Sequence, residues 1–174
     1  MDRPGRSPPR FPPVLEPAAA RQIALVLDQL HAGPDDLALC QAAAGGDLIF
    51  LEACQVRSVR VQVVLPFDEA RFMHESVLPS AHGAQWAHRY RAVRARLAEA
   101  PHTLPAKPGG DPFERCNESL LAAALHWGVD RARFICLWNG GPPGGPGGTA
   151  HLVERARQHG LVPRVIDTRL LPAA

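Results

Sequence analysis

The residues best placed to do chemistry in this sequence belong to a glycine- and proline-rich turn at residues 139–148. An apolar run at residues 134–138 precedes the turn, and Gly147, Gly148 and Thr149 open an amphipathic helix after it. Glycines leave backbone N–H groups uncovered, and a helix N-terminus carries partial positive charge. A strand, a glycine turn and a helix start in this order predict a binding site for a phosphate-bearing ligand. The alternative is a connecting loop that binds nothing.

A weaker copy of the same pattern lies earlier in the chain. An apolar run at residues 37–41 leads through small residues to Gly45, Gly46 and Asp47, where a helix is expected to begin. Asp47 suits an N-cap, and the alternative is a contact with a ligand hydroxyl group. Glu52 follows more than one helical turn later, where a solvated glutamate is common. For an enzyme, these two carboxylates are the weak candidates for general acid and base.

Two asparagines are the remaining polar candidates for contacts with a ligand. Asn117 stands in the first half of a helix rich in alanine and leucine, where a buried amide caps the helix, bonds to a loop or reaches a ligand. Asn139 begins the glycine turn. The sequence shows no Ser-His-Asp spacing, no metal-ligand cluster and no phosphate-loop lysine, because the single lysine, Lys107, stands apart from the glycine turns. We therefore expect no metal site and no resident cofactor.

The elements that must position these residues alternate along the chain. Apolar periodicity predicts helices at residues 16–30, 47–55, 69–77, 85–99, 114–127 and 149–159. It predicts strands at residues 37–41, 59–65, 134–138 and 161–167, with a short strand within 101–105. No two strands are close enough for a hairpin, so we expect an α/β fold with one mainly parallel, doubly wound sheet and helices on both faces.

This domain is expected to span residues 14–174, and residues 1–13 to form an extended arm rich in proline and arginine. The run at residues 134–138 predicts a strand that is buried on both faces. Ligands of doubly wound sheets bind beyond the carboxyl ends of the strands, and both glycine turns fall at such ends. Fold and motifs thus point to the same edge of the sheet.

Charge and cysteine content limit which partners and which cellular compartment are expected for this protein. The formal net charge is only +2 and the arginines are spread along the chain, so nucleic acid is not an expected partner. The four cysteines are far apart and form no C-x-x-C pair, which favours free thiols in a reducing cytoplasm over disulfides or zinc. No stretch is long and apolar enough to span a membrane, and residues 1–13 are too polar for a signal peptide. We therefore expect a cytoplasmic protein that does not contact membranes.

Several segments together resemble a known family. They are Arg-Phe-Pro-Pro at residues 10–13, Ala-Gly-Gly-Asp at 44–47 with Glu52, Leu-Pro-Phe at 65–67, Asn117, Trp-Asn-Gly at 138–140 and Gly-Gly-Thr-Ala at 147–150. This set is similar to the Rossmann-like module of the SLOG and LOG (lysine-decarboxylase-like) superfamily, which occurs beside cyclase, TIR and tetratricopeptide regions in bacterial multidomain signalling proteins. The resemblance covers nearly the whole chain, and its most specific part is the last motif.

The resemblance implies a Rossmann-like domain that binds a nucleotide or nucleotide-derived ligand as a sensor or regulatory module. The residues expected to hold the ligand are Gly45, Gly46, Asp47, Asn117, Asn139, Gly147, Gly148 and Thr149. Gly147, Gly148 and Thr149 are expected to hold a phosphate, and Asp47 with Asn117 or Asn139 to contact sugar or base.

Two departures from the family pattern add expectations. Related modules begin with a further strand, ending in a Gly-His turn, just before a Pro-Gly-Arg segment; residues 4–6 are that segment, and no such strand precedes it. Two explanations are open: the sheet lacks an edge or central strand, or the start of the sequence is truncated. A homo-oligomer would cover the edge left by a missing strand. In LOG-type phosphoribohydrolases, Gly-Gly-x-Gly-Thr-x-x-Glu supplies a glutamate that helps to break an N-glycosidic bond. Leu152 holds that place here. Binding without catalysis is the leading hypothesis; the alternatives are a nucleotide N-glycosidic hydrolase and a structural domain without ligand.

Overall fold

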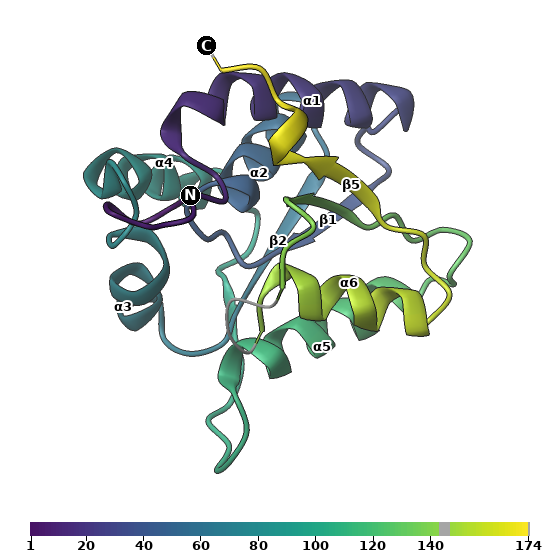
Figure 1. Ribbon diagram of the computed structural model, residues 1–174. Coiled ribbons are helices and arrows are strands. Elements are labelled where there is room, and N and C mark those ends of the chain that lie inside the picture. Colours follow the sequence, from purple (N-terminus) through teal and green to yellow (C-terminus); the bar gives the residue numbers. More distant parts are fainter. Residues whose placement is uncertain (143–146, 174) are drawn as a thin grey trace.

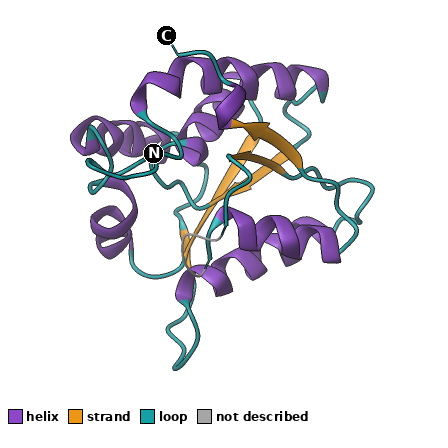
Figure 2. Cartoon of the chain, in the orientation of Figure 1, coloured by secondary structure: helices purple, strands orange, loops and turns teal. Residues whose placement is uncertain are grey.

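The computed structural model describes residues 1–142 and 147–173, in which helices lie on both sides of short parallel strands (Figures 1 and 2). The α-helices are α1 (Glu16–Gln29), α2 (Gly46–Val56), α3 (Glu69–Phe72), α4 (Gly83–Ala95), α5 (Pro112–Leu125) and α6 (Thr149–Gln158). The strands are β1 (Leu37–Cys40), β2 (Arg60–Leu65), β3 (His102–Thr103), β4 (Ile135–Trp138) and β5 (Arg164–Asp167). Short helical turns are η1 (Pro13–Leu15), η2 (Met73–Val77) and η3 (Thr168–Leu170).

The expected alternation of helices and strands is confirmed, with local differences. The helix expected at residues 69–77 is divided into α3 and the π-helical turn η2, where the Leu78 N–H donates to Met73 O at 2.9 Å. Asp68 caps α3 by accepting from the Arg71 N–H at 2.9 Å. A short polar side chain that accepts from an early N–H group is a frequent helix start.

The strands form two sheets and not the one continuous sheet that was expected. β2 lies between β1 and β3, with Leu37 opposite Arg60 and Val64 opposite His102, whereas β4 pairs with β5 alone. Every one of these pairs is parallel, which confirms the α/β class with parallel strands. No ladder joins β1 to β4 among the described residues, so the sheet is interrupted between these two strands.

The layers pack unequally around this interruption. α1, α2 and α4 pack together on one side, and α5 and α6 on the other (Figure 1). Most of the largest fully buried side chains, among them Phe72 and Trp86, belong to the main core, which includes Val63 and Leu65 of β2. β2, which has a strand on each side, buries Val63, Val64 and Leu65 completely or nearly so. The four residues of β4 are only half-buried, which corrects the expectation that this strand is buried on both faces.

The first residues fold back onto the domain, so the expected arm is held in place. The Asp2 carboxylate accepts from the N–H groups of Arg10 and Phe11 at 2.7 and 2.8 Å, which closes residues 2–11 into a loop. The Met1 amino group donates to Ala44 O at 2.6 Å, beside the start of α2. Phe11 is 7 % exposed and joins the main core. The segment therefore contributes both to the core and to the region around α2.

Candidate functional site

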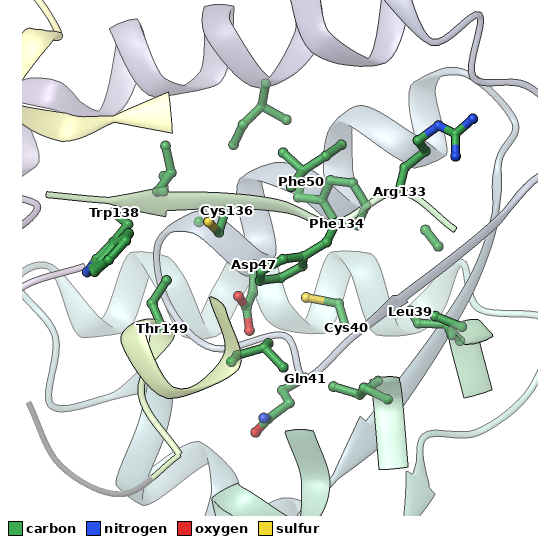
Figure 3. A pocket seen from close by; sticks show the side chains of 18 of the residues that line it. Leu39, Cys40, Gln41, Asp47, Phe50, Arg133, Phe134, Cys136, Trp138 and Thr149 are labelled. Carbon is green, nitrogen blue, oxygen red and sulfur yellow. The ribbon is translucent and has the colours of Figure 1, made fainter. Parts of the chain in front are cut away.

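A cavity of about 940 Å³ occupies the interruption between the two sheets (Figure 3). Its walls are the neighbouring edges of β1 and β4, with α1 and α2 on one face and α5 and α6 on the other. One end lies where β1 leads into α2, beside the start of β4's following turn and the residues that precede α6. This end, the carboxyl-end mouth, is lined by Arg10, Asp47, Asn139, Gly147, Gly148 and Thr149. It is the place where doubly wound folds bind their ligands.

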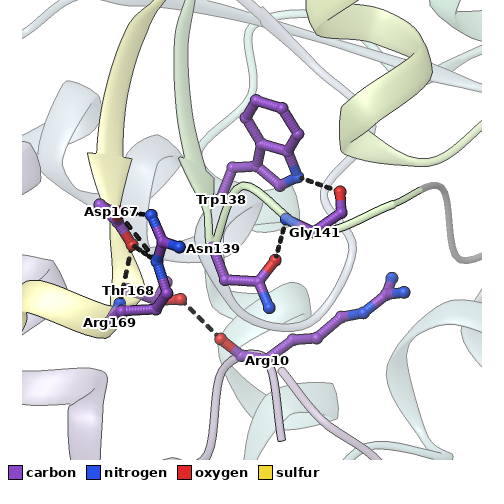
Figure 4. A network of polar contacts seen from close by, with 7 residues as sticks. All are labelled: Arg10, Trp138, Asn139, Gly141, Asp167, Thr168 and Arg169. Atoms are coloured by element: carbon purple, nitrogen blue, oxygen red, sulfur yellow. Dashed lines mark hydrogen bonds and ion pairs between the residues drawn. The ribbon is translucent and has the colours of Figure 1, made fainter. Parts of the chain in front are cut away.

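Side-chain hydrogen bonds organise the turn after β4 (Figure 4). The Asn139 Oδ1 accepts from the Gly141 N–H at 3.0 Å, and the Trp138 indole N–H donates to Gly141 O at 3.1 Å. Asn139, expected to contact a ligand, therefore uses its oxygen to close its own turn, as asparagine often does. Residues 143–146 of the glycine turn lie outside the described residues.

Asn117 ties three segments together below the mouth. It is 3 % exposed; its Oδ1 accepts from Gln41 Nε2 at 2.7 Å, and its Nδ2 donates to Gly147 O at 2.7 Å. Gln41 directly follows β1, Asn117 is in α5, and Gly147 precedes α6. Of the three roles open to Asn117 in the sequence, the structure shows the bond to a loop. It also shows that the residue after β1 and the residues before α6 lie at the same edge.

The two glycines before α6 have different roles. Gly147 has φ +70°, and a Cβ at this position would lie 2.4 Å from Phe113 Cβ on α5. Only glycine combines this backbone angle with so close an approach. Gly148 is the N-cap, with φ −73° and ψ 170°, an extended conformation that any residue adopts. Thr149 is the first residue of α6, so the cavity reaches the free N–H groups of that helix.

The earlier glycine pair also makes close contacts. Gly45 has φ +106°, and a Cβ there would lie 2.2 Å from Met1 N, so this glycine makes room for the chain start. A Cβ at Gly46 would lie 3.2 Å from Leu137 Cδ1 on β4. Gly46 therefore brings α2 against the strand on the far side of the interruption. Gly46 lines the cavity, whereas Gly45 is not among its lining residues.

Asp47 is the expected acid that does reach the cavity (Figure 3). Gly45 holds the N-cap position of α2, so Asp47 lies in the first turn, where its Oδ2 accepts from the Ala43 N–H at 3.1 Å. Burial raises the pKa of the Asp47 carboxyl, and the Ala43 N–H opposes the shift. Burial likewise raises the pKa of the neighbouring Cys40 thiol well above its usual range. Cys40 is therefore a neutral thiol at neutral pH and a poor nucleophile.

Glu52 lies apart from the cavity. Its carboxylate accepts from Arg89 Nε and Nη2 at 2.7 and 2.5 Å, and Arg89 also pairs with Glu16. This cluster, the Arg89 ion cluster, joins α1, α2 and α4. Because Glu52 does not line the cavity, the structure does not bring the two carboxylate candidates together in one site.

Arg10 also lines the cavity, although sequence reasoning did not select it. Its carbonyl oxygen accepts from Thr168 Oγ1 at 2.7 Å (Figure 4). Its Nη2 donates to Pro142 O at 3.3 Å. These bonds hold a guanidinium group at the mouth, beside the turn that follows β4. The available signal was its place in the Arg-Phe-Pro-Pro segment at residues 10–13.

In the described part of the chain, no three or more His, Cys, Asp or Glu side chains cluster as metal ligands would. No helix of residues 1–142 and 147–173 has the length and apolarity needed to cross a membrane. Comparison with protein-family models, with curated proteins and with solved structures finds no match to this chain.

Proposed function

We propose that this protein binds a nucleotide or nucleotide-derived phosphate ligand at the carboxyl-end mouth, as a sensor or regulatory module without catalysis of its own. The observation that carries the proposal is the convergence of the α6 N-terminus, Arg10 and Asp47 on one end of one large cavity. The parallel α/β arrangement is compatible with the Rossmann-like SLOG and LOG superfamily, whose members bind such ligands.

The phosphate end of the ligand belongs beside Gly148 and Thr149. The first N–H groups of a helix have no partner within the helix, and the helix dipole favours an anion there. The Thr149 hydroxyl adds a further donor, and the Arg10 guanidinium supplies a full positive charge at the same mouth. Backbone donors plus an arginine are a common way to hold phosphate oxygens.

The sugar and base belong on the side of Asp47 and Trp138. A carboxylate accepts hydrogen bonds from hydroxyl groups, and Asp47 lines the cavity from the first turn of α2. The Trp138 ring also lines the cavity and offers an aromatic face on which a base can stack. Asn117 acts indirectly, because both ends of its amide are bonded to Gln41 and Gly147.

The test is calorimetric titration of wild-type protein with AMP, cyclic nucleotides and ADP-ribose. Arg10→Gln removes the charge and should weaken binding by about tenfold to a hundredfold, and Thr149→Ala by about tenfold. Arg3→Gln is the matched control, since Arg3 is exposed in the same N-terminal segment and does not line the cavity. If no nucleotide releases or absorbs heat, or if Arg10→Gln binds as tightly as Arg3→Gln, the proposal is wrong.

A nucleotide N-glycosidic hydrolase is the second candidate, because one observation favours it. Asp47 faces the cavity with a raised pKa, which is the property of a carboxyl group that donates a proton to a leaving base. Against it, Leu152 lines the cavity where the family motif has its glutamate. Chromatography of AMP incubated with wild-type protein and with Asp47→Asn decides the matter. Base release by wild type alone would establish the enzyme, and no release by either would remove this candidate.

A further inference from the structure

The interruption between β1 and β4 leaves two strand edges open. β1 pairs only with β2 and β4 only with β5, so within the described residues the facing N–H and C=O groups of both strands have no ladder partner. Open edges in the middle of a parallel sheet are unusual, because parallel sheets are normally buried and fully paired. In most folds an open edge is short, charged or covered. Here both edges carry apolar side chains: Leu-Ala-Leu-Cys in β1 and Ile-Cys-Leu-Trp in β4.

The space between these edges, which we term the strand slot, has the polarity of a buried strand position. Its walls on both faces are apolar, with Ile23, Leu27 and Phe50 from α1 and α2, and Leu120, Leu121 and Leu152 from α5 and α6. A strand in a doubly wound sheet meets helices on both faces and is apolar on both. The half-buried state of all four β4 residues shows how much apolar surface the slot leaves uncovered.

Charged side chains line the slot only at its two ends. Asp35 and Asp36 precede β1, Arg60 is the first residue of β2, and Arg131 and Arg133 precede β4, so these five belong to the amino end. Asp2, Arg10 and Asp47 belong to the carboxyl-end mouth. The middle offers backbone groups and hydrocarbon, together with the thiols of Cys40 and Cys136. A segment that fits must therefore be apolar in its centre and polar at its ends.

The length of the slot also matches a strand. Each open edge is four residues long, so a short strand placed between them would meet backbone N–H and C=O groups on both sides. Two hydrogen bonds of Asn117 tie Gln41, which follows β1, to α5 and to Gly147 before α6, and so fix this end of the slot. The slot is thus preorganised, so most of the conformational entropy lost on binding is that of the inserted segment.

From these observations we infer that the strand slot binds an extended apolar segment of a partner polypeptide, which becomes the central strand between β1 and β4. The partner segment is about five or six residues long, rich in valine, isoleucine or alanine, without charge or proline in its centre. Main-chain hydrogen bonds supply affinity and the apolar faces supply specificity, as in other cases of strand addition. This goes beyond the proposed ligand site, which lies at the mouth; the slot adds the open backbone edges of β1 and β4, and the two share Arg10, Asp47 and Trp138.

The test uses wild-type protein and a blocked synthetic peptide whose central six or so residues alternate valine, isoleucine and alanine, with a lysine at each end for solubility. Hydrogen–deuterium exchange is followed by mass spectrometry with and without peptide. Binding should slow amide exchange about tenfold or more in residues 37–41 and in residues 135–138 together. A matched peptide with two central prolines cannot donate to the ladder and should leave both segments unchanged.

A pair of variants tests the location. Cys136→Phe places a large ring in the slot and should abolish peptide binding, whereas Val162→Phe, at a position 87 % exposed, should not. Circular dichroism checks that both variants fold, and if Cys136→Phe does not, the comparison of the two peptides on wild-type protein decides. No binding, protection of one edge only, or equal protection by the proline peptide would overturn the inference.

Two other occupants give distinct results. If sedimentation shows a dimer whose β1 and β4 amides are protected before any peptide is added, the occupant is a second copy of the chain and the inference is wrong. If AMP alone protects the amides along the whole slot, the space is a nucleotide cavity and the inference is also wrong. Failure of nucleotide binding with intact peptide binding would instead reject the proposed function and leave the strand slot standing.

Discussion

Asn117→Ala should destabilise the fold more than any other truncation at the carboxyl-end mouth. The wild-type amide is 3 % exposed and makes two hydrogen bonds of 2.7 Å, one accepted from Gln41 Nε2 and one donated to Gly147 O. Each bond contributes about 1 kcal/mol, and Gln41, itself 9 % exposed, is left with an amide that has lost this partner, at a cost of about 1 kcal/mol more. The expected loss of unfolding free energy is therefore about 3 kcal/mol.

Urea unfolding followed by circular dichroism measures this loss, and a double-mutant cycle with Gln41→Ala assigns it. If the Gln41–Asn117 bond is the coupled element, the cycle should give an interaction energy of about 1 kcal/mol. Asn139→Ala serves as the control, because its amide oxygen makes one local bond, to the Gly141 N–H, in a half-buried turn. That change should cost about 0.5 to 1 kcal/mol.

Two results would refute the structural role of Asn117. One is a destabilisation by Asn117→Ala that is no larger than that of Asn139→Ala. The other is a variant of unchanged stability that no longer binds nucleotide, since this would make the amide a ligand contact. Weakened binding together with lost stability is the expected pattern, because Asn117 holds the carbonyl of Gly147 next to the proposed phosphate site.

Three further changes have definite expected outcomes. Gly147→Ala should cost about 2 to 4 kcal/mol in urea unfolding, because it combines a positive φ with a collision against α5, whereas Gly148→Ala should keep the fold within about 1 kcal/mol. Burial raises the pKa of the Asp47 carboxyl in the folded state, so the free energy of unfolding falls as pH rises above the unfolded pKa of about 4. Asp47→Asn removes this titration, so it should raise the Tm at pH 7, and the difference from wild type should vanish near pH 4. Glu52→Gln should cost less than about 1 kcal/mol, a loss that shrinks in high salt, because the ion pair with Arg89 is partly exposed, and nucleotide affinity should not change.

The order of helices and strands could be predicted from the sequence because it depends on local periodicity. The stripe in α1 and the apolar run of β4 are visible without tertiary information. Asp68 and Gly160 are equally local signals at helix ends: Asp68 is the N-cap of α3, and Gly160, with φ +80°, follows the end of α6. These features follow from side-chain spacing and capping chemistry within a few residues.

The interruption of the sheet and the fate of the site residues depend on distant partners. Nothing in the sequence indicates that Asn117 and Gly147, which are 30 positions apart, form a hydrogen bond. The sequence does not distinguish Gly147 from Gly148, and only the backbone angles show which of the two positions requires glycine. Arg10 stands among prolines that indicate an extended arm, and its position at the mouth depends on bonds to Pro142 and Thr168.

The proposed ligand site and the strand slot share one cavity, and Asp47 stands where they meet. A strand inserted between β1 and β4 would displace water from the region beside Asp47, which lowers the local dielectric and strengthens the field of the α6 N-terminus and of Arg10 at the mouth. The phosphate would then bind more tightly, and a carboxylate at Asp47 would be harder to maintain unless a ligand hydroxyl bonds to it. By linkage, any gain in nucleotide affinity caused by the strand equals the gain in strand affinity caused by the nucleotide. Binding of a partner strand and binding of the nucleotide would then be coupled, because both change the dielectric of the same cavity. This coupling requires no movement of the helices.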